Sequence, residues 1–158
     1  MDLELSGKRV LVTGSGSGIG RGIAEGFLKE KALAILSDLN ETFLNNTSKE
    51  FSNLYGRDKV LIFFGDLKKS EMLEILYQFI IEKIGGLDHL VCNIGSGKSV
   101  PPLDEDVTEF QRMLDINLLN AVGVVNQLLP LLEKSVSKDS CFPSITFVGS
   151  ICGVETLG

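Results

Sequence analysis

Residues 8–20 read KRVLVTGSGSGIG and decide the fold of the chain. The apolar and β-branched run at residues 10–13 predicts a buried strand, and glycine then occupies every second position from Gly14 to Gly20. A helix is expected to follow at once, with the apolar residues of 19–28 on one face. Strand, glycine turn and helix together predict a diphosphate site, because glycine allows close backbone approach and a helix start offers free N–H groups.

The composition bounds the partners and the compartment. The chain has 158 residues, 44% of them hydrophobic, which is enough for one domain with a sizeable core. A net charge of −6 argues against nucleic acid and anionic membranes as partners. Polar residues within the apolar run 118–132 argue against a membrane span. Three cysteines and a polar start without a targeting signal predict reduced thiols and a cytoplasmic location.

Further apolar runs alternate with amphipathic segments along the chain. Strands are expected at residues 32–38, 60–64, 87–92 and 144–148, with helices between them. This alternation predicts an α/β fold, a Rossmann-type doubly wound parallel sheet of five strands with helices on both faces.

Capping residues predict where the helices begin and end. Asn40 is expected to cap the second helix and Gly56 to stop it. Ser70 is expected to cap the third helix, which Gly85 ends. Thr108 opens a capping box for the long helix before the last strand.

Polar or glycine residues follow each predicted strand, at Gly14, Asp38, Asp66, Asn93 and Ser150. Ligands bind such sheets beyond the carboxyl ends of the strands, so these residues are expected to share one edge. Asp38 comes about two dozen residues after Gly14, where an acid bonds the adenosine ribose of NAD and repels a 2′-phosphate. The spacing therefore favours NAD over NADP as the cofactor. A solvated loop aspartate is the alternative.

The glycine turn has the pattern Thr-Gly-x-x-x-Gly-x-Gly, which resembles the cofactor loop of the short-chain dehydrogenase/reductase family. The resemblance implies an oxidoreductase that transfers hydride between nicotinamide and a small secondary alcohol or ketone. Members that prefer NADP often carry a basic residue where this chain has Ser17, which again favours NAD. The implied cofactor-binding residues are Thr13, Gly14, Ser15, Ser17, Gly18, Ile19, Gly20, Asp38, Asp66, Leu67, Asn93 and Gly95.

Two of these positions carry open questions. Asp66 resembles the family aspartate at the adenine ring edge, but a simple turn residue is nearly as good an interpretation. The segment at residues 92–95 reads CNIG where the family has Asn-Asn-Ala-Gly, so only Asn93 and Gly95 carry over. Crowding or an altered set of hydrogen bonds is expected from Cys92 and Ile94.

Asn117 and Ser150 are the catalytic candidates. Asn117 falls within the predicted buried stripe of the long helix, where a satisfied core amide is the simpler alternative. The resemblance implies that Asn117 holds a water in a proton relay and that Ser150 bonds the substrate oxygen. A nucleophilic serine is not expected, because Gly-x-Ser-x-Gly is absent and the one histidine, His89, lies within a predicted strand.

The family's catalytic Tyr-x-x-x-Lys segment is absent from residues 1–158, whose tyrosines are Tyr55 and Tyr77. We therefore expect a single dinucleotide-binding domain truncated before that segment, inactive alone, with residues 144–148 as an unprotected edge strand. The complete protein is expected to form a homo-oligomer. One alternative is a non-catalytic module that binds NAD or a partner protein. An NTPase, suggested by residues 95–99, is disfavoured because Cys92 replaces a required glycine.

Overall fold

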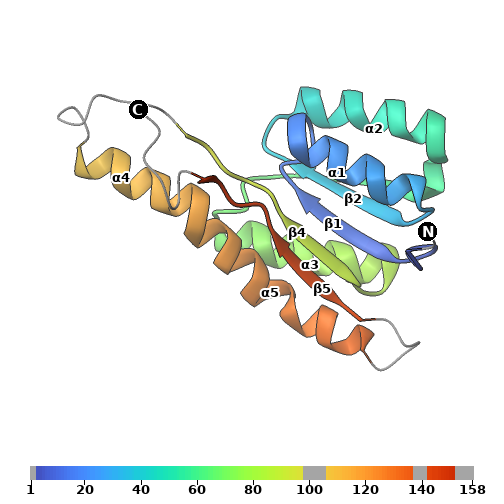
Figure 1. The fold of residues 1–158 in the computed structure, drawn as a ribbon. Coiled ribbons are helices and arrows are strands. Elements are labelled where there is room, and N and C mark those ends of the chain that lie inside the picture. The colour runs from blue at the N-terminus through green and yellow to red at the C-terminus, as the bar shows by residue number, and fades with distance from the viewer. Residues whose placement is uncertain (1–2, 98–105, 137–141, 152–158) are drawn as a thin grey trace.

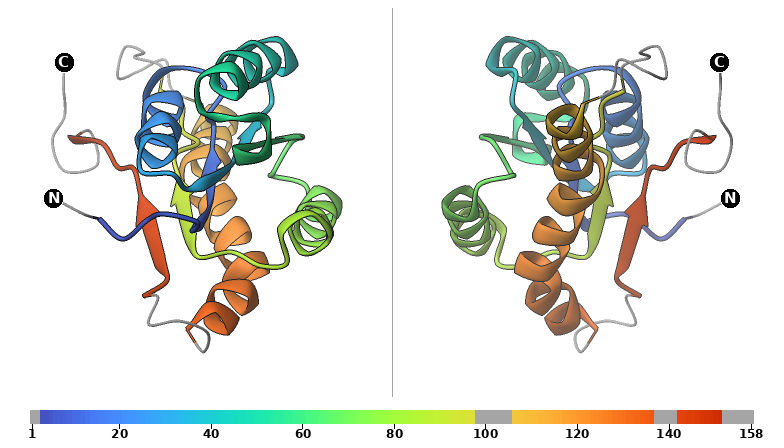
Figure 2. Two further views of the ribbon diagram at one scale, coloured as in Figure 1. Left: turned by 90° about the vertical axis from the view of Figure 1, so that its right-hand side faces the viewer. Right: turned by 90° about the vertical axis from the view of Figure 1, so that its left-hand side faces the viewer.

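The computed structural model of the chain describes residues 3–97, 106–136 and 142–151. The described strands form one parallel sheet in the order β3-β2-β1-β4-β5, with helices on both faces (Figures 1 and 2). The strands are β1 (Arg9–Thr13), β2 (Leu33–Asp38), β3 (Val60–Phe64), β4 (His89–Cys92) and β5 (Ser144–Phe147). The strand order reverses between β1 and β4, which is where sheets of this kind bind ligands. The predicted fold class is confirmed.

Two helices cover each face of the sheet. On one face lie α1 (Gly18–Lys29) and α2 (Glu41–Tyr55), and on the other α3 (Ser70–Ile84) and α5 (Asn120–Ser135). A short 3₁₀ turn, η1 (Arg57–Lys59), precedes β3. The last helix is continuous with α4 (Val107–Leu114) through a π-helical turn, η2 (Asp115–Leu119), as Figure 1 shows.

The core divides into two clusters because successive strand residues point to opposite faces. Val10 and Val12 of β1 pack with α1 and α2, whereas Leu11 between them packs with α3 and α5. All three side chains are fully buried. This burial on both faces explains why the β1 run is continuously apolar rather than alternating.

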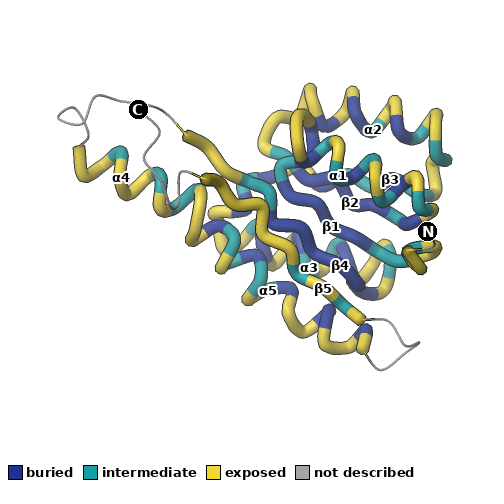
Figure 3. Tube along the Cα trace, in the orientation of Figure 1, coloured by how far each residue is buried: buried dark blue, intermediate teal, exposed yellow. Residues whose placement is uncertain are grey.

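Strand β5 lies at the edge of the described sheet and pairs with β4. Its residues are mostly exposed (Figure 3), and Phe147 is 59% accessible. The strand therefore presents an edge within the described residues, as the sequence predicts.

Three predicted helix caps are confirmed, among them Gly85 at the end of α3, and two predicted caps are wrong. The Asn40 side chain accepts a hydrogen bond from the Phe43 N–H, and Gly56 ends the same helix, as predicted. The Thr108 cap is wrong, because Asp106 is the N-cap and accepts from the Glu109 N–H over 2.7 Å. Ser70 is the first helical residue of α3 rather than its cap.

The helical stretch Val107–Ser135 is long and apolar enough, by length and composition alone, to cross a membrane. The polar residues within this stretch are therefore too few to exclude a membrane span by composition, contrary to the prediction from the sequence. Core helices of soluble proteins pass the same test, and α5 buries Val124, Leu128, Leu131 and Leu132 in the core shared with α3 and β4. One face of α5 thus lies in the core, while 22% of the apolar window is buried in the structure.

Candidate functional site: a nucleotide pocket at the strand ends

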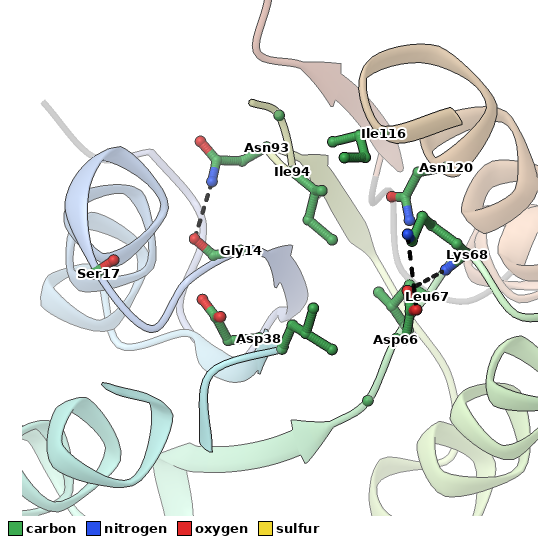
Figure 4. Close-up of a pocket in the computed structure, with 13 residues that line it drawn as sticks. Gly14, Ser17, Asp38, Asp66, Leu67, Lys68, Asn93, Ile94, Ile116 and Asn120 are labelled. Atoms are coloured by element: carbon green, nitrogen blue, oxygen red, sulfur yellow. Dashed lines mark hydrogen bonds and ion pairs between the residues drawn. The ribbon is translucent and has the colours of Figure 1, made fainter. Parts of the chain in front are cut away.

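A pocket of about 320 Å³ opens at the carboxyl ends of β1 to β4 (Figure 4). The strand ends and the first turn of α5 contribute side chains to it, so segments far apart in the sequence meet there. Its lining residues are Gly14, Ser17, Asp38, Leu39, Gly65, Asp66, Leu67, Lys68, Asn93, Ile94, Gly95, Ile116 and Asn120. Four of the five predicted strand-end residues therefore share one cavity.

The turn between β1 and α1 needs its glycines for two reasons. Gly14 and Gly18 have φ angles of +64° and +56°, which other residues rarely adopt. A Cβ atom on Gly20 would collide with the carbonyl oxygen of Gly14 and the side-chain amide of Asn93. Ser17, the N-cap of α1, makes no side-chain capping bond. The first N–H groups of α1 therefore begin the helix without a side-chain cap, in the arrangement that binds phosphate.

Two buried hydroxyls hold this turn against the neighbouring strands. The Thr13 hydroxyl donates to the Val91 carbonyl and accepts from the Asn93 N–H over 3.0 Å. The Ser15 hydroxyl donates to the Val12 carbonyl over 2.8 Å and accepts from the Ser37 N–H over 3.0 Å. Both residues are almost completely buried, so their observed role is structural. A direct contact of Thr13 or Ser15 with a cofactor stays a prediction, as it does for the exposed Ile19.

Asp38 presents a fixed carboxylate at the pocket. One oxygen accepts a hydrogen bond from the Gly16 N–H and the other from the Asn40 N–H, each over 2.8 Å. A carboxylate accepts about four hydrogen bonds, so acceptor capacity remains for a ligand. Asp38 is therefore more than a solvated loop residue, because it joins the end of β2 to the glycine turn.

Asn93 ties the end of β4 to the same turn. Its side-chain amide donates to the carbonyls of Thr13 and Gly14, each over 3.1 Å. Of the two departures from the family segment, Ile94 lines the pocket, whereas Cys92 points into the core beneath α3 and α5. Burial raises the pKa of the Cys92 thiol to about 11, so this side chain is neutral. Crowding of a ligand could therefore come from Ile94 and not from Cys92, and it stays a prediction.

Asp66 makes the turn contact considered from the sequence and lines the pocket, while its contact with an adenine ring stays a prediction. Its carboxylate accepts from the Lys68 N–H over 3.1 Å, which is a turn contact, and it also lines the pocket. The Lys68 ammonium lies 4.0 Å from the other oxygen of Asp66. Leu67 is buried beside them and supplies apolar lining.

Asn117 is exposed, so the prediction that it lies in a buried stripe is wrong. Its side-chain oxygen accepts from the Ser96 N–H over 2.8 Å, and its amide donates to the Ser96 carbonyl over 2.9 Å. Neither α4 nor η2 buries any of its residues, whereas Val124 and Leu128 of α5 are buried as the stripe predicts. Phe110 and Leu118 of the predicted stripe are also more than half exposed.

A different side-chain amide of this helix lies at the pocket. Asn120 is buried at the start of α5 and lines the pocket together with Ile116, one turn earlier. Sequence reasoning missed both residues. A polar residue within an apolar run was the available signal, but the buried asparagine of this helix is Asn120, whereas the stripe predicted Asn117.

Ser150 is exposed and follows β5 on the strand-end side of the sheet. It is not among the residues that line the pocket around Asp38. The N–H of Val148 donates to the Cys92 carbonyl over 3.0 Å, so pairing with β4 continues one residue past β5. This pairing positions the backbone that leads to Ser150.

Two other predicted features are only partly described. The glycine-rich segment considered for an NTPase is described as far as Gly97, and Lys98 and Ser99 lie outside the described residues. Within the described ranges, no group of three His, Cys, Asp or Glu side chains is placed to hold a metal ion.

The sequence model of one protein family, described as short chain dehydrogenase, matches residues 8–157. The chain belongs to the short chain dehydrogenase family. One curated relative with a similar sequence is the 7α-hydroxysteroid dehydrogenase of Escherichia coli K12, which is 31% identical over 134 residues. That alignment covers 85% of this chain and 51% of the relative. The chain thus spans about half the length of the curated relatives it matches.

Solved structures of family members share the same architecture. The L-sorbose reductase of Gluconobacter frateurii, solved with NADPH and L-sorbose, has a TM-score of 0.87 and 29% identity over 98% of this chain and 56% of its own. A 7α-hydroxysteroid dehydrogenase, solved with NADH and 7-oxo glycochenodeoxycholic acid, has a TM-score of 0.88 and 28% identity over 99% of this chain and 58% of its own. The two structures thus contain different nicotinamide cofactors and different small molecules.

Proposed function

We propose that this chain is the cofactor-binding part of an oxidoreductase that transfers hydride between nicotinamide and a secondary alcohol or ketone, with NAD preferred over NADP. The carrying observation is the Asp38 carboxylate, fixed by the Gly16 and Asn40 N–H groups at the pocket beside the glycine turn. The proposal of a small-molecule substrate agrees with the sorbose and steroid ligands of the solved relatives. Homo-oligomerisation and a cytoplasmic location stay predictions.

The described residues fit a dinucleotide. Gly20 lets the start of α1 pack directly against the Gly14 carbonyl, and that helix start, which has no side-chain cap, lies at the glycine turn. In the proposed complex this turn holds the diphosphate, Asp38 bonds the adenosine ribose, and Asp66 with Leu67 lies beside the adenine. Asn93 and Gly95 support the chain toward the nicotinamide end.

The preference for NAD rests on charge. A 2′-phosphate placed near the Asp38 carboxylate would meet a like charge, and Ser17 offers no positive charge against it. The ammonium of Lys68 lies beside Asp66, the acidic residue at the end of the next strand. Because the solved relatives contain both NADH and NADPH, the proposal depends on Asp38 rather than on the family.

The bound cofactor supplies the hydride acceptor or donor. We assign to Ser150 a hydrogen bond to the substrate oxygen and to Asn117 the anchoring of a proton relay. The Asn117 side chain is hydrogen-bonded to both the N–H and the carbonyl of Ser96, which follows Gly95 of the pocket. The general acid–base is not assigned to residues 1–158.

The test is turnover by the full-length protein with a panel of secondary alcohols and NAD, and of ketones and NADH. The proposal predicts a cofactor-dependent change in nicotinamide absorbance with at least one member of the panel. Tight NAD binding with no turnover across a broad panel would instead support the non-catalytic module, although membership of a family of dehydrogenases and reductases does not favour it.

A further inference from the structure

Thr47 makes a contact that its helical position does not require. It lies in the middle of α2, is 4% exposed and is the polar member of that helix's buried set, beside Leu44 and Phe51. A threonine within a helix commonly bonds a carbonyl of its own helix. The Thr47 hydroxyl instead donates to the Gly16 carbonyl, in the glycine turn, over 2.7 Å.

Both backbone polar groups of Gly16 are hydrogen-bonded to side chains. Its carbonyl accepts from Thr47, and its N–H donates to the Asp38 carboxylate. The second Asp38 oxygen accepts from the Asn40 N–H, and the Asn40 side chain caps α2 at Phe43. The hydrogen bonds therefore form a closed network. They connect Thr47 of α2 to the glycine turn, the turn to Asp38 at the end of β2, and Asp38 to Asn40 at the start of α2.

Close packing around Gly16 restrains this hydrogen-bond network. Gly16 is buried, and a Cβ atom on it would lie 2.8 Å from the Asp38 oxygen. A shift of the Gly16 peptide therefore moves the donor that fixes Asp38. Without the Thr47 hydroxyl, the buried Gly16 carbonyl would lose a hydrogen-bond donor. We expect the Gly16 peptide to move toward water or another donor, because an unpaired buried carbonyl is costly.

We propose that Thr47 is a positioning residue for the ribose site: through Gly16 it holds the Asp38 carboxylate in the orientation that binds NAD and disfavours NADP. This inference rests on the proposed function. Thr47 acts through Gly16 and Asp38 and does not itself line the pocket. Its contribution should therefore appear in cofactor affinity and selectivity.

The experiment compares three variants of the full-length protein. Thr47→Val keeps the shape and removes the hydroxyl, Thr47→Ser keeps the hydroxyl, and Thr42→Val makes the same change at an exposed site of the same helix. Dissociation constants for NAD and NADP are measured by calorimetry. The exchange rate of the Gly16 amide is measured by NMR without cofactor.

Thr47→Val is expected to weaken NAD binding about 5- to 10-fold, the effect of one neutral hydrogen bond, and to narrow the preference over NADP. It should also speed exchange of the Gly16 amide, whereas Thr47→Ser and Thr42→Val should resemble the wild type. If Thr47→Val does not fold, Thr47→Ala gives the same comparison. Unchanged NAD affinity and selectivity in a folded hydroxyl-free variant would overturn the inference alone. Failure of the wild type to bind NAD would overturn the proposed function, and this inference with it.

Discussion

The Asp38 carboxylate and the Gly16 N–H lie 2.8 Å apart and are joined by a hydrogen bond. The bond connects the end of β2 to the glycine turn that follows β1. One residue pair thus couples the predicted diphosphate site to the predicted ribose site.

Gly20→Ala should disrupt nucleotide binding. The new methyl group would collide with the Gly14 carbonyl and the Asn93 amide, so the turn or the end of β4 must shift. Overpacking of this kind costs about 1–3 kcal/mol of folding stability, and we expect NAD affinity to fall by about 10-fold or more. Gly22→Ala is the matched control, because a Cβ there meets nothing within 4 Å. Calorimetric NAD affinity equal in both variants would show that the turn does not contact the cofactor.

His89 should make the fold less stable in mild acid. Its side chain is buried in β4, with Nδ1 2.9 Å from the Ser144 hydroxyl of β5, and burial lowers its pKa. Asp88 opposes that shift and Lys8 adds to it. Because the unfolded chain binds the proton more readily, stability is full above the ordinary pKa of 6.5 and is lost as the pH falls through the lower folded-state pKa.

Urea unfolding at about pH 7.5 and about pH 5.5 measures this effect. The wild type should have a lower free energy of unfolding at the lower pH, and the difference should shrink in His89→Gln. An equal pH dependence in both proteins would remove His89 as the cause.

Asn117→Ala and Ser150→Ala should affect turnover more than cofactor binding. Both residues lie away from the Asp38 side of the pocket, and neither lines it. We expect kcat of the full-length protein to fall by about 10-fold or more in each, with the dissociation constant of NAD changed little. Ser48→Ala on α2 serves as a control. Full turnover by Ser150→Ala would withdraw the role proposed for its hydroxyl.

The architecture was predictable because its signals are local. Apolar runs mark the strands, Asn40 and Gly56 bound α2 as predicted, and the alternation of elements allows few sheets other than a parallel one. Gly14, Asp38, Asp66 and Asn93 reach one pocket for the same reason, since parallel strands place their ends at one edge. The predicted cap Thr108 lies two residues after Asp106, which the geometry of α4 shows to be the cap.

What the sequence could not show depends on long-range geometry. The segments α4 and η2 bury none of their residues, which apolar spacing alone does not reveal, so the helical stripe assigned Asn117 to the core and missed Asn120. The bond from Thr47 to Gly16 joins residues 31 positions apart, and a helical threonine gives no hint of it. The buried role of Ser15 likewise depends on its contact with Ser37 in the neighbouring strand.

The most direct test of the account is calorimetric titration of the full-length protein with NAD and with NADP at one ionic strength, for the wild type and Asp38→Ala. The account predicts saturable binding of NAD by the wild type, tighter than NADP by about 10-fold or more, because the carboxylate bonds the ribose and repels the 2′-phosphate. Asp38→Ala should weaken NAD binding and narrow that gap. NADP binding as tight as NAD binding in the wild type, or no saturable binding of either cofactor, would contradict it.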